Sequence, residues 1–308
     1  MGIVNVTPDS FSDGGLHADT ESAVAHGLLL AAEGAAIVDV GGESTRPGSE
    51  SVAVDDELAR VVPVVERLAA ATPALVSIDT TKAAVACAAL DAGAGLVNDV
   101  TALRGDPAMT ALVAERGCPV CLMHMLGEPR TMQDDPRYDD VVGEVVAFLE
   151  ERLAVAVAAG VREEQVLLDP GIGFGKTLEH NLLLLRHLDR IAALGRPVVL
   201  GASRKRFIGA LLDLAPPERV AGTVATTVLG LAAGAAVIRV HDVRPNVEAL
   251  RVAQAILEAG EAAGGRTRDR SSVADPTDER TAGAGRAGDR SGAAGGSGAS
   301  GASRGDAS

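Results

Sequence analysis

Aromatic residues are nearly absent from this chain: Phe, Tyr and Trp make up 2% of the 308 residues, and there is no Trp. The core must therefore be packed by Ala, Val and Leu, and a hydrophobic fraction of 47% is ample for this. Three cysteines are too few for a disulfide framework and indicate a reducing, cytoplasmic compartment. Cys118 and Cys121 form a Cys-x-x-Cys within a strand-like run, where residues three apart face opposite sides, so we interpret both as buried apolar side chains.

Positive charge is also scarce. Lys and Arg number 28 against 42 Asp and Glu, and the resulting net charge of −14 argues against nucleic acid or an anionic membrane as a partner. No stretch approaches the roughly 18 apolar residues of a membrane span. Asn5, Pro8 and Asp9 stand where a signal peptide would have its apolar segment, so no signal peptide is expected.

Short apolar runs alternate with helix-like stretches along most of the chain. The runs do not alternate with polar residues, which is typical of parallel strands buried on both faces. We predict strands at residues 3–6, 36–40, 74–78, 95–97, 120–123, 165–168, 197–200 and 236–238. We predict helices at residues 21–33, 54–70, 82–90, 108–115, 141–159, 182–193, 206–212, 218–231 and 247–261.

Six helical stretches end in glycine, which supplies a left-handed C-cap before the next strand: Gly34, Gly93, Gly117, Gly160, Gly195 and Gly234. Eight β/α units in about 260 residues match the size of a (β/α)8 TIM barrel, an α/β fold. A doubly wound open sheet is the alternative, but it would not need eight similar units. Residues 1–263 are predicted to form this single domain. Residues 264–308 are rich in Gly, Ala, Ser, Arg and Asp and lack periodic apolar positions, which predicts a disordered low-complexity tail.

Polar or charged groups follow every predicted strand. In a barrel the C-terminal strand ends form one rim, where the chemistry takes place. This rim is predicted to carry Asn5, Arg46, Asp79, Asn98, His124, Asp169, Lys205, Arg239 and His241. Each has an ordinary explanation when taken alone: Asp79 could cap a helix, and His124 could be a core histidine. The evidence for a functional site is that all of these residues are predicted to lie at one face of the barrel.

The types of side chain indicate two kinds of ligand group. Amide, guanidinium and imidazole groups suit phosphate oxygens, and Asn5, Arg46, Arg239 and His241 supply them. The acids and amides Asp79, Asn98 and Asp169, together with Lys205, suit a flat nitrogen heterocycle. Asp13, Asp99 and Asp242 are alternative metal ligands. On these residues alone, a sugar-phosphate isomerase or an aldolase with Lys205 as Schiff-base lysine is the favoured function.

Seven motifs in order resemble the dihydropteroate synthase family of bacterial folate synthesis: MGIVNVTPDSFSDGG, GGESTRPG, SIDT, NDV, DPGIGFGK, GASRKRFIG and RVHDV. The resemblance extends from about Met1 to Gly260. It implies a pterin-binding (β/α)8 barrel, usually a homodimer, and an enzyme that is the target of sulfonamides. The implied reaction joins 6-hydroxymethyl-7,8-dihydropterin diphosphate to 4-aminobenzoate and releases pyrophosphate, with assistance from Mg²⁺.

The same resemblance assigns roles to particular residues. The pterin would be held by Asp79, Asn98, Asp169 and Lys205, with Met123 packed on its ring. The diphosphate would be bound by Thr45, Arg46, Arg239 and His241, and Mg²⁺ by Asn5. The aminobenzoate site would be walled by Pro47 and Phe174, and Ser203 would also contact substrate. The catalytic residues would be Asp79, Lys205, Arg239 and His241, under closing loops at 7–15 and 46–51.

Two departures from the family pattern affect these expectations. Many members have serine at the position of Arg206, so Arg206 is expected to replace that hydroxyl beside the aminobenzoate carboxylate. The family also usually carries a hairpin before the first strand, so we expect a start upstream of Met1 or a less well sealed barrel floor. A methyltetrahydrofolate-type methyl transferase should lack both the Arg-Val-His motif and the lysine of Ser-Arg-Lys. A pterin-binding copy without catalytic activity remains the alternative.

Overall fold

The computed structural model describes residues 1–6, 15–44, 49 and 51–259 of the chain. Thr45, Arg46 and Pro47 lie outside the described residues, as does nearly all of the loop predicted to close the site at residues 7–15. The predicted tail at 264–308 and its boundary at residue 263 lie outside them too. Among the described residues, no helix combines the length and apolar character needed to cross a membrane.

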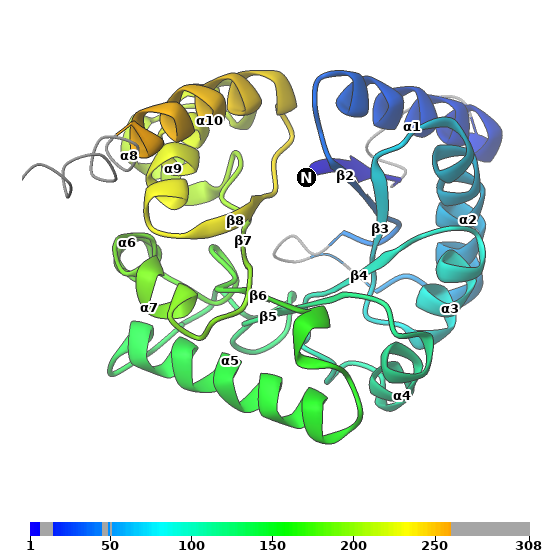
Figure 1. Ribbon diagram of the computed structural model, residues 1–308, viewed down its shortest axis with the longest axis horizontal. Coiled ribbons are helices and arrows are strands. Elements are labelled where there is room, and N and C mark those ends of the chain that lie inside the picture. The colour runs from blue at the N-terminus through cyan, green and yellow to red at the C-terminus, as the bar shows by residue number, and fades with distance from the viewer. Residues whose placement is uncertain (7–14, 45–48, 50, 260–308) are drawn as a thin grey trace, which may run out of the picture. The chain divides into compact units, whose positions relative to one another are not determined.

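Eight parallel strands pair in chain order and form the wall of a barrel (Figure 1). The strands are β1 (Gly2–Asn5), β2 (Ile37–Gly41), β3 (Leu75–Asp79), β4 (Leu96–Asp99), β5 (Val120–Met123), β6 (Val166–Asp169), β7 (Val198–Leu200) and β8 (Ala235–Ile238). The two ends of the sheet meet where Gly2 bridges Val240 in parallel. At this junction Ile3 N donates to Val240 O at 3.1 Å, and Val240 N donates to Met1 O at 2.9 Å. The predicted (β/α)8 barrel is therefore confirmed.

Helices connect successive strands and surround the sheet (Figure 1). They are α1 (Gly15–Ala32), α2 (Val54–Ala71), α3 (Ala83–Asp91), α4 (Pro107–Arg116), α5 (Val141–Ala158), α6 (Leu178–Arg186), α7 (Leu188–Ala192), α8 (Arg206–Leu212), α9 (Val220–Ala232) and α10 (Val243–Glu258). Short 3₁₀ turns occupy Glu163–Gln165 and Pro216–Glu218. All six predicted C-cap glycines have positive φ, from 61° at Gly117 to 109° at Gly93, which confirms that interpretation.

Several predicted helices differ from the structure in their extent: α1 begins at Gly15 instead of residue 21, and α10 begins at Val243 instead of residue 247. The stretch predicted at residues 182–193 is two helices, α6 and α7, because His187 departs from helical geometry with φ −113° and ψ 31°. Helix α6 also begins earlier than expected. The Thr177 hydroxyl accepts a hydrogen bond from His180 N at 3.2 Å and so caps the N-terminus at residue 178.

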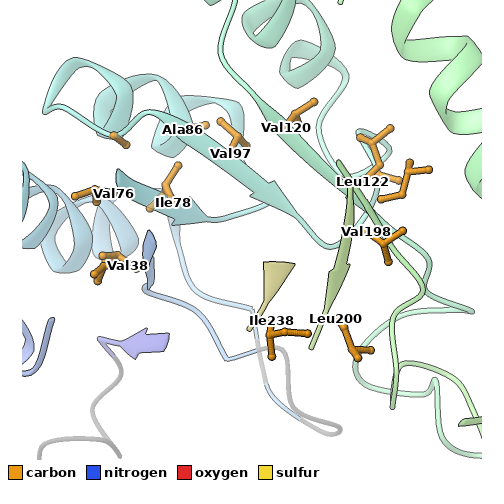
Figure 2. Packing of buried hydrophobic residues seen from close by; sticks show 14 of the residues in the cluster. Val38, Val76, Ile78, Ala86, Val97, Val120, Leu122, Val198, Leu200 and Ile238 are labelled. Atoms are coloured by element: carbon orange, nitrogen blue, oxygen red, sulfur yellow. The ribbon is translucent and has the colours of Figure 1, made fainter. Parts of the chain in front are cut away.

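The core has an outer and an inner part. Small aliphatic side chains of successive strands, with several labelled in Figure 2, pack between the sheet and the helices. Inside the barrel, Leu96, Cys121, Leu167 and Val199 form a separate buried cluster. Apolar packing on both faces explains why the strands read as continuous apolar runs. Cys118 and Cys121 are buried free thiols, as predicted.

Truncation of a buried strand residue tests the outer core. Leu122 on β5 is fully buried, so Leu122→Ala should lower the free energy of unfolding by about 2–5 kcal/mol through lost burial and a residual cavity. Urea denaturation measures this change. The matched control is Leu29→Ala on α1, where the side chain is 52% exposed and the expected loss is under about 0.5 kcal/mol. Equal losses in the two variants would contradict this packing.

Candidate active site

The predicted site residues with described positions lie at or just beyond the C-terminal ends of the strands. Asn5, Asp79, Met123 and Asp169 are the last residues of β1, β3, β5 and β6, and Asn98 is the penultimate residue of β4. Ser203 and Lys205 follow β7, and Arg239 and His241 follow β8. Because all strands are parallel, these residues share one rim of the barrel.

The Arg239 guanidinium lies between two carboxylates from neighbouring strands. Its Nε donates to Asp39 Oδ2 at 2.7 Å, and its Nη2 donates to Asp79 Oδ2 at 2.6 Å. Asn98 Nδ2 donates to the same Asp39 oxygen at 3.1 Å. Burial by itself would lower the pKa of Arg239, but Asp39 and Asp79 outweigh it and raise that pKa above its ordinary value. Arg239 therefore stays charged.

Burial shifts the pKa of two rim acids, Asp79 and Asp169, upward. It raises the pKa of Asp79 to about 7; Asp39, Glu57 and Asp99 add to this shift, and Arg239 opposes it. Burial also raises the pKa of Asp169, against the influence of Lys205 and the Gly171 N–H. The pKa of Lys205 falls to about 8 because burial outweighs the attraction of Asp169. The site thus holds groups whose charge can change near neutral pH.

The loop after β6, residues 171–175, carries Phe174 and is held by donors from other segments. Asp169 Oδ1 accepts from Gly171 N at 2.7 Å, which orients the carboxylate. Lys205 Nζ donates to the carbonyl of Ile172 and lies 4.5 Å from the centroid of the Phe174 ring. Glycine is required at residue 171, where φ is 66° and a Cβ would lie 1.9 Å from the carbonyl oxygen of His124.

The segment between β5 and α5 supports the same loop. Gln133 Nε2 donates to Gly173 O at 2.6 Å, and the Tyr138 hydroxyl donates to Gly175 O at 2.9 Å. Lys176 Nζ donates to Phe174 O at 2.9 Å and lies 2.8 Å from His124 Nδ1. Together with Lys205, these groups fix the backbone that presents Phe174.

His124 is a core histidine and not a rim ligand. Its ring packs edge-on against Phe148, with centroids 4.8 Å apart, and bonds to the buried Lys176. Burial, reinforced by the charge of Lys176, lowers the pKa of His124 to about 3. The structure thus favours the ordinary explanation of this residue.

The ends of β7 and β8 are tied together. Ser203 Oγ accepts from His241 N at 3.1 Å and lies 3.0 Å from His241 Nδ1. Arg204 Nε donates to Asp242 Oδ2 at 2.8 Å. Asp242 is therefore an ion-pair partner of Arg204, and its alternative role as a metal ligand stays a prediction.

Asp99 also has a structural role. Its oxygens accept from Thr101 N at 2.8 Å and Thr101 Oγ1 at 2.7 Å, and from Leu103 N at 2.8 Å. These bonds organise the turn after β4. Asp13 lies outside the described residues. Arg206 is the first residue of α8 and is exposed, and its expected role stays a prediction.

Three charged residues near the site were missed by the sequence reasoning: Asp39 on β2, Glu57 on α2 and Lys82 at the start of α3. Lys82 Nζ pairs with both Glu43 and the fully buried Glu57. The available signal was a carboxylate inside an apolar run, in Ile37-Val38-Asp39-Val40. Such a residue indicates a strand whose inner face meets polar partners.

A cavity of about 520 Å³ opens beside Asp79 at the ends of β2, β3 and β4. Its wall contains many hydroxyl and carboxylate groups, among them Glu43, Ser44, Ser49, Ser51, Glu57, Thr80, Thr81, Thr101 and Glu128. Arg130 also lines it. This volume is within the usual range for a small-molecule site.

No cluster of three or more His, Cys, Asp or Glu able to hold a metal occurs in the part of the chain that the structure describes. Asn5, half-buried at the end of β1, offers an amide oxygen. Magnesium is commonly held by one or two carboxylates, with substrate phosphates and water completing its shell. Asn5 offers one neutral oxygen toward such a shell, and its assignment to Mg²⁺ stays a prediction.

The fold and the rim define a (β/α)8 barrel of the kind that carries an active site at the C-terminal ends of its strands. Comparison with known proteins agrees, because a model of the pterin binding enzyme family matches residues 1–241. Dihydropteroate synthase of Escherichia coli (strain K12) is 49% identical over 261 residues, covering 85% of this chain and 92% of the relative. The Mycobacterium leprae enzyme of that name is 52% identical over 267 residues, covering 84% and 94%.

Solved structures give the same result. Xanthomonas albilineans dihydropteroate synthase with 4-aminobenzoic acid superposes with a TM-score of 0.79 at 54% identity, covering 83% of this chain and 92% of that one. The same enzyme in complex with 7,8-dihydropteroate gives 0.76 at 51% identity, with the same coverage. The Yersinia pestis enzyme with a sulfonamide drug complex gives 0.80 at 46%, covering 84% and 94%. The chain belongs to the pterin-binding enzymes and, within them, to the dihydropteroate synthase family.

The buried His124 predicts acid sensitivity. An unfolded histidine binds a proton with a pKa of about 6.5, whereas the folded pKa is about 3. The free energy of unfolding should therefore fall as the pH drops from 6.5 toward 3, because His124 binds a proton in the unfolded state but not in the folded state. His124→Gln should reduce the loss of melting temperature between pH 7 and pH 4.5, and calorimetry measures this. The control, His187→Gln at the half-buried junction of α6 and α7, should keep the wild-type pH slope.

Proposed function

We propose that this chain catalyses the dihydropteroate synthase reaction, joining 6-hydroxymethyl-7,8-dihydropterin diphosphate to 4-aminobenzoate and releasing pyrophosphate. The observation that carries the proposal is the half-buried Arg239 between Asp39 and Asp79 at a rim that also holds Asn98, Asp169 and Lys205. This set combines an anion-binding group with acceptors for a nitrogen heterocycle. Family membership supports the same reaction.

The pterin would lie among Asp79, Asn98, Asp169 and Lys205. Carboxylate oxygens accept hydrogen bonds from ring and amino N–H groups, and the lysine donates to a ring oxygen or nitrogen. Met123 is buried in an apolar cluster with Val100, Met125 and Met132, against which Phe174 packs, so its thioether can cover one face of the ring.

The diphosphate would be bound by Arg239 and His241, and the family resemblance adds Thr45 and Arg46, which lie outside the described residues. Arg239 Nε and Nη2 are engaged by Asp39 and Asp79, and among the described residues Nη1 has no partner. That Nη1 group would therefore face the leaving anion. Mg²⁺, held at Asn5, would neutralise part of the diphosphate charge.

The reaction breaks the bond between the pterin methylene carbon and the diphosphate oxygen, and the electron pair leaves with the pyrophosphate. Arg239 and His241 stabilise the negative charge that develops there. The positive charge left on the pterin is offset by the carboxylate of Asp79. The 4-aminobenzoate nitrogen then forms the new bond to the methylene carbon and loses a proton. Phe174 and Pro47 would wall the ring of this second substrate, and Ser203 would contact it.

A homodimer in the cytoplasm is part of the proposal. Four apolar side chains on the neighbouring helices α9 and α10 are 50–68% exposed: Leu229, Val252, Ile256 and Leu257. A patch of this kind supports an interface between two copies. The three cysteines are free thiols, which supports a reducing compartment.

The primary test is pyrophosphate release by the purified chain supplied with the pterin diphosphate and Mg²⁺, with and without 4-aminobenzoate. Release that depends on aminobenzoate and yields dihydropteroate is expected. Binding of the pterin without turnover would instead identify a copy that has lost catalysis.

Replacement of Asp169 tests the pterin site. Asp169→Asn should lower kcat/KM by about 100-fold, because two charge-assisted hydrogen bonds to the pterin are weakened at roughly 1.4 kcal/mol each. Steady-state assay of pyrophosphate release measures it. Asp189→Asn, at an exposed position on α7, is the control and should stay within about twofold of wild type. A near-normal kcat/KM for Asp169→Asn would rule out this role.

Charge placed on the exposed apolar patch tests the dimer. Ile256→Glu on α10 should shift the mass in solution from dimer toward monomer, because it buries a carboxylate in the interface. Analytical ultracentrifugation measures the mass. Val157→Glu on α5 is the matched control at another exposed apolar position and should leave the dimer intact. A wild-type monomer would overturn the proposal.

A further inference from the structure

Asp39 is a buried carboxylate in the middle of β2. It is 0% exposed and stands between Val38 and Val40, which belong to the outer core. Its register partners are Ile3 on β1 and Ser77 on β3. Asp39 precedes Gly41, the register partner of Asp79, by two residues, so it lies one layer of side chains below the rim.

A single oxygen of Asp39 connects two residues assigned to substrate. Oδ2 accepts from Arg239 Nε at 2.7 Å and from Asn98 Nδ2 at 3.1 Å. These partners come from the segment after β8 and from β4, on either side of Asp39 within the barrel. Asp39 thus supports both the anion-binding group and one of the pterin groups.

The bond to Asn98 determines what this amide can offer to a ligand. A carboxylate only accepts hydrogen bonds, so the NH₂ group of Asn98 must be the end that meets Asp39. The carbonyl oxygen Oδ1 is then the end left for a ligand. Together with the carboxylates of Asp79 and Asp169, it makes a row of acceptors suited to the N–H groups of a pterin.

The bond to Arg239 sets the plane of the guanidinium. Asp39 engages Nε and Asp79 engages Nη2, so two carboxylates on adjacent strands fix a rigid planar group at two points. The direction of Nη1, which would meet the diphosphate, follows from these two bonds.

The polar residues at this position lower the stability of the folded state. Asp39 Oδ1 and the hydroxyl of its register partner Ser77 are buried and have no hydrogen-bond partner among the described residues. Buried polar atoms without hydrogen-bond partners destabilise a fold. An apolar pair would pack here without this cost. A stability role therefore does not explain the acid.

We propose that Asp39 is a positioning residue that turns the Asn98 carbonyl oxygen toward the pterin and sets the guanidinium plane of Arg239 for the diphosphate. This inference rests on the proposed function.

Removal of the charge of Asp39 should shift the pH profile of kcat/KM, which a purely structural role would not do. Five charged groups face Asp79 or influence it, namely Asp39, Arg239, Glu57, Asp99 and Lys205. Removal of the charge on Asp39 takes away a repulsion and leaves Asp79 as the main partner of Arg239. Both changes lower the pKa of Asp79.

The test compares Asp39→Asn, Asp39→Glu and the control Ser77→Ala. Three quantities are measured: the melting temperature, the Kd for 6-hydroxymethyl-7,8-dihydropterin without diphosphate, and the pH profile of kcat/KM. For Asp39→Asn we expect the Kd to rise about tenfold, since roughly 1.4 kcal/mol is lost with the amide orientation. The acid limb of the profile should move down by about one pH unit. Ser77→Ala, in the same buried layer, should keep the wild-type Kd and profile.

Asp39→Glu keeps the charge but moves the carboxylate by one methylene. It should weaken pterin binding while the acid limb stays in place, and it decides the question if Asp39→Asn does not fold. A wild-type Kd in either folded variant would overturn the positioning role. If the wild-type chain forms no dihydropteroate, the proposed function fails, but pterin affinity still tests Asp39 independently.

Discussion

The ion pairs of one guanidinium hold the site together. Arg239 reaches from the end of β8 to Asp39 and Asp79 on the neighbouring strands β2 and β3. Buried charges are tolerated only with partners, and removal of one partner leaves the others uncompensated. Since Asp39 also holds Asn98, the orientation of the pterin groups and that of the anion-binding group depend on the same contacts.

A second constraint acts on the opposite side of the rim. Each backbone carbonyl from Gly171 to Gly175 accepts a hydrogen bond, the first from Phe174 N and the others from side chains of Lys205, Gln133, Lys176 and Tyr138. A loop without regular secondary structure thereby acquires a defined backbone. The same Lys205 lies beside Asp169 and the ring of Phe174, so the two predicted substrate sites share one lysine.

Sequence reasoning located the rim well because its logic is geometric. Parallel strands point their C-terminal ends the same way, so Asp79, Asp169 and Arg239 share a rim whatever the packing details are. It was less accurate where contacts with residues distant in the sequence determine the local structure. The predicted helix at 182–193 breaks at His187. For His124 the sequence left a core histidine and a rim ligand both open, and the structure favours the core histidine, because Phe148 and Lys176 enclose its ring.

The sequence by itself determined the eight-unit alternation, the C-cap glycines and the polar strand ends, since these depend on local periodicity and backbone preference. Only the tertiary structure decided the role of Asp39, which stands in an apolar run of the sequence. Its partners lie 59 and 200 residues away in the chain. Strand register around the closed barrel brings them within hydrogen-bond distance, and no local pattern encodes a contact of that kind.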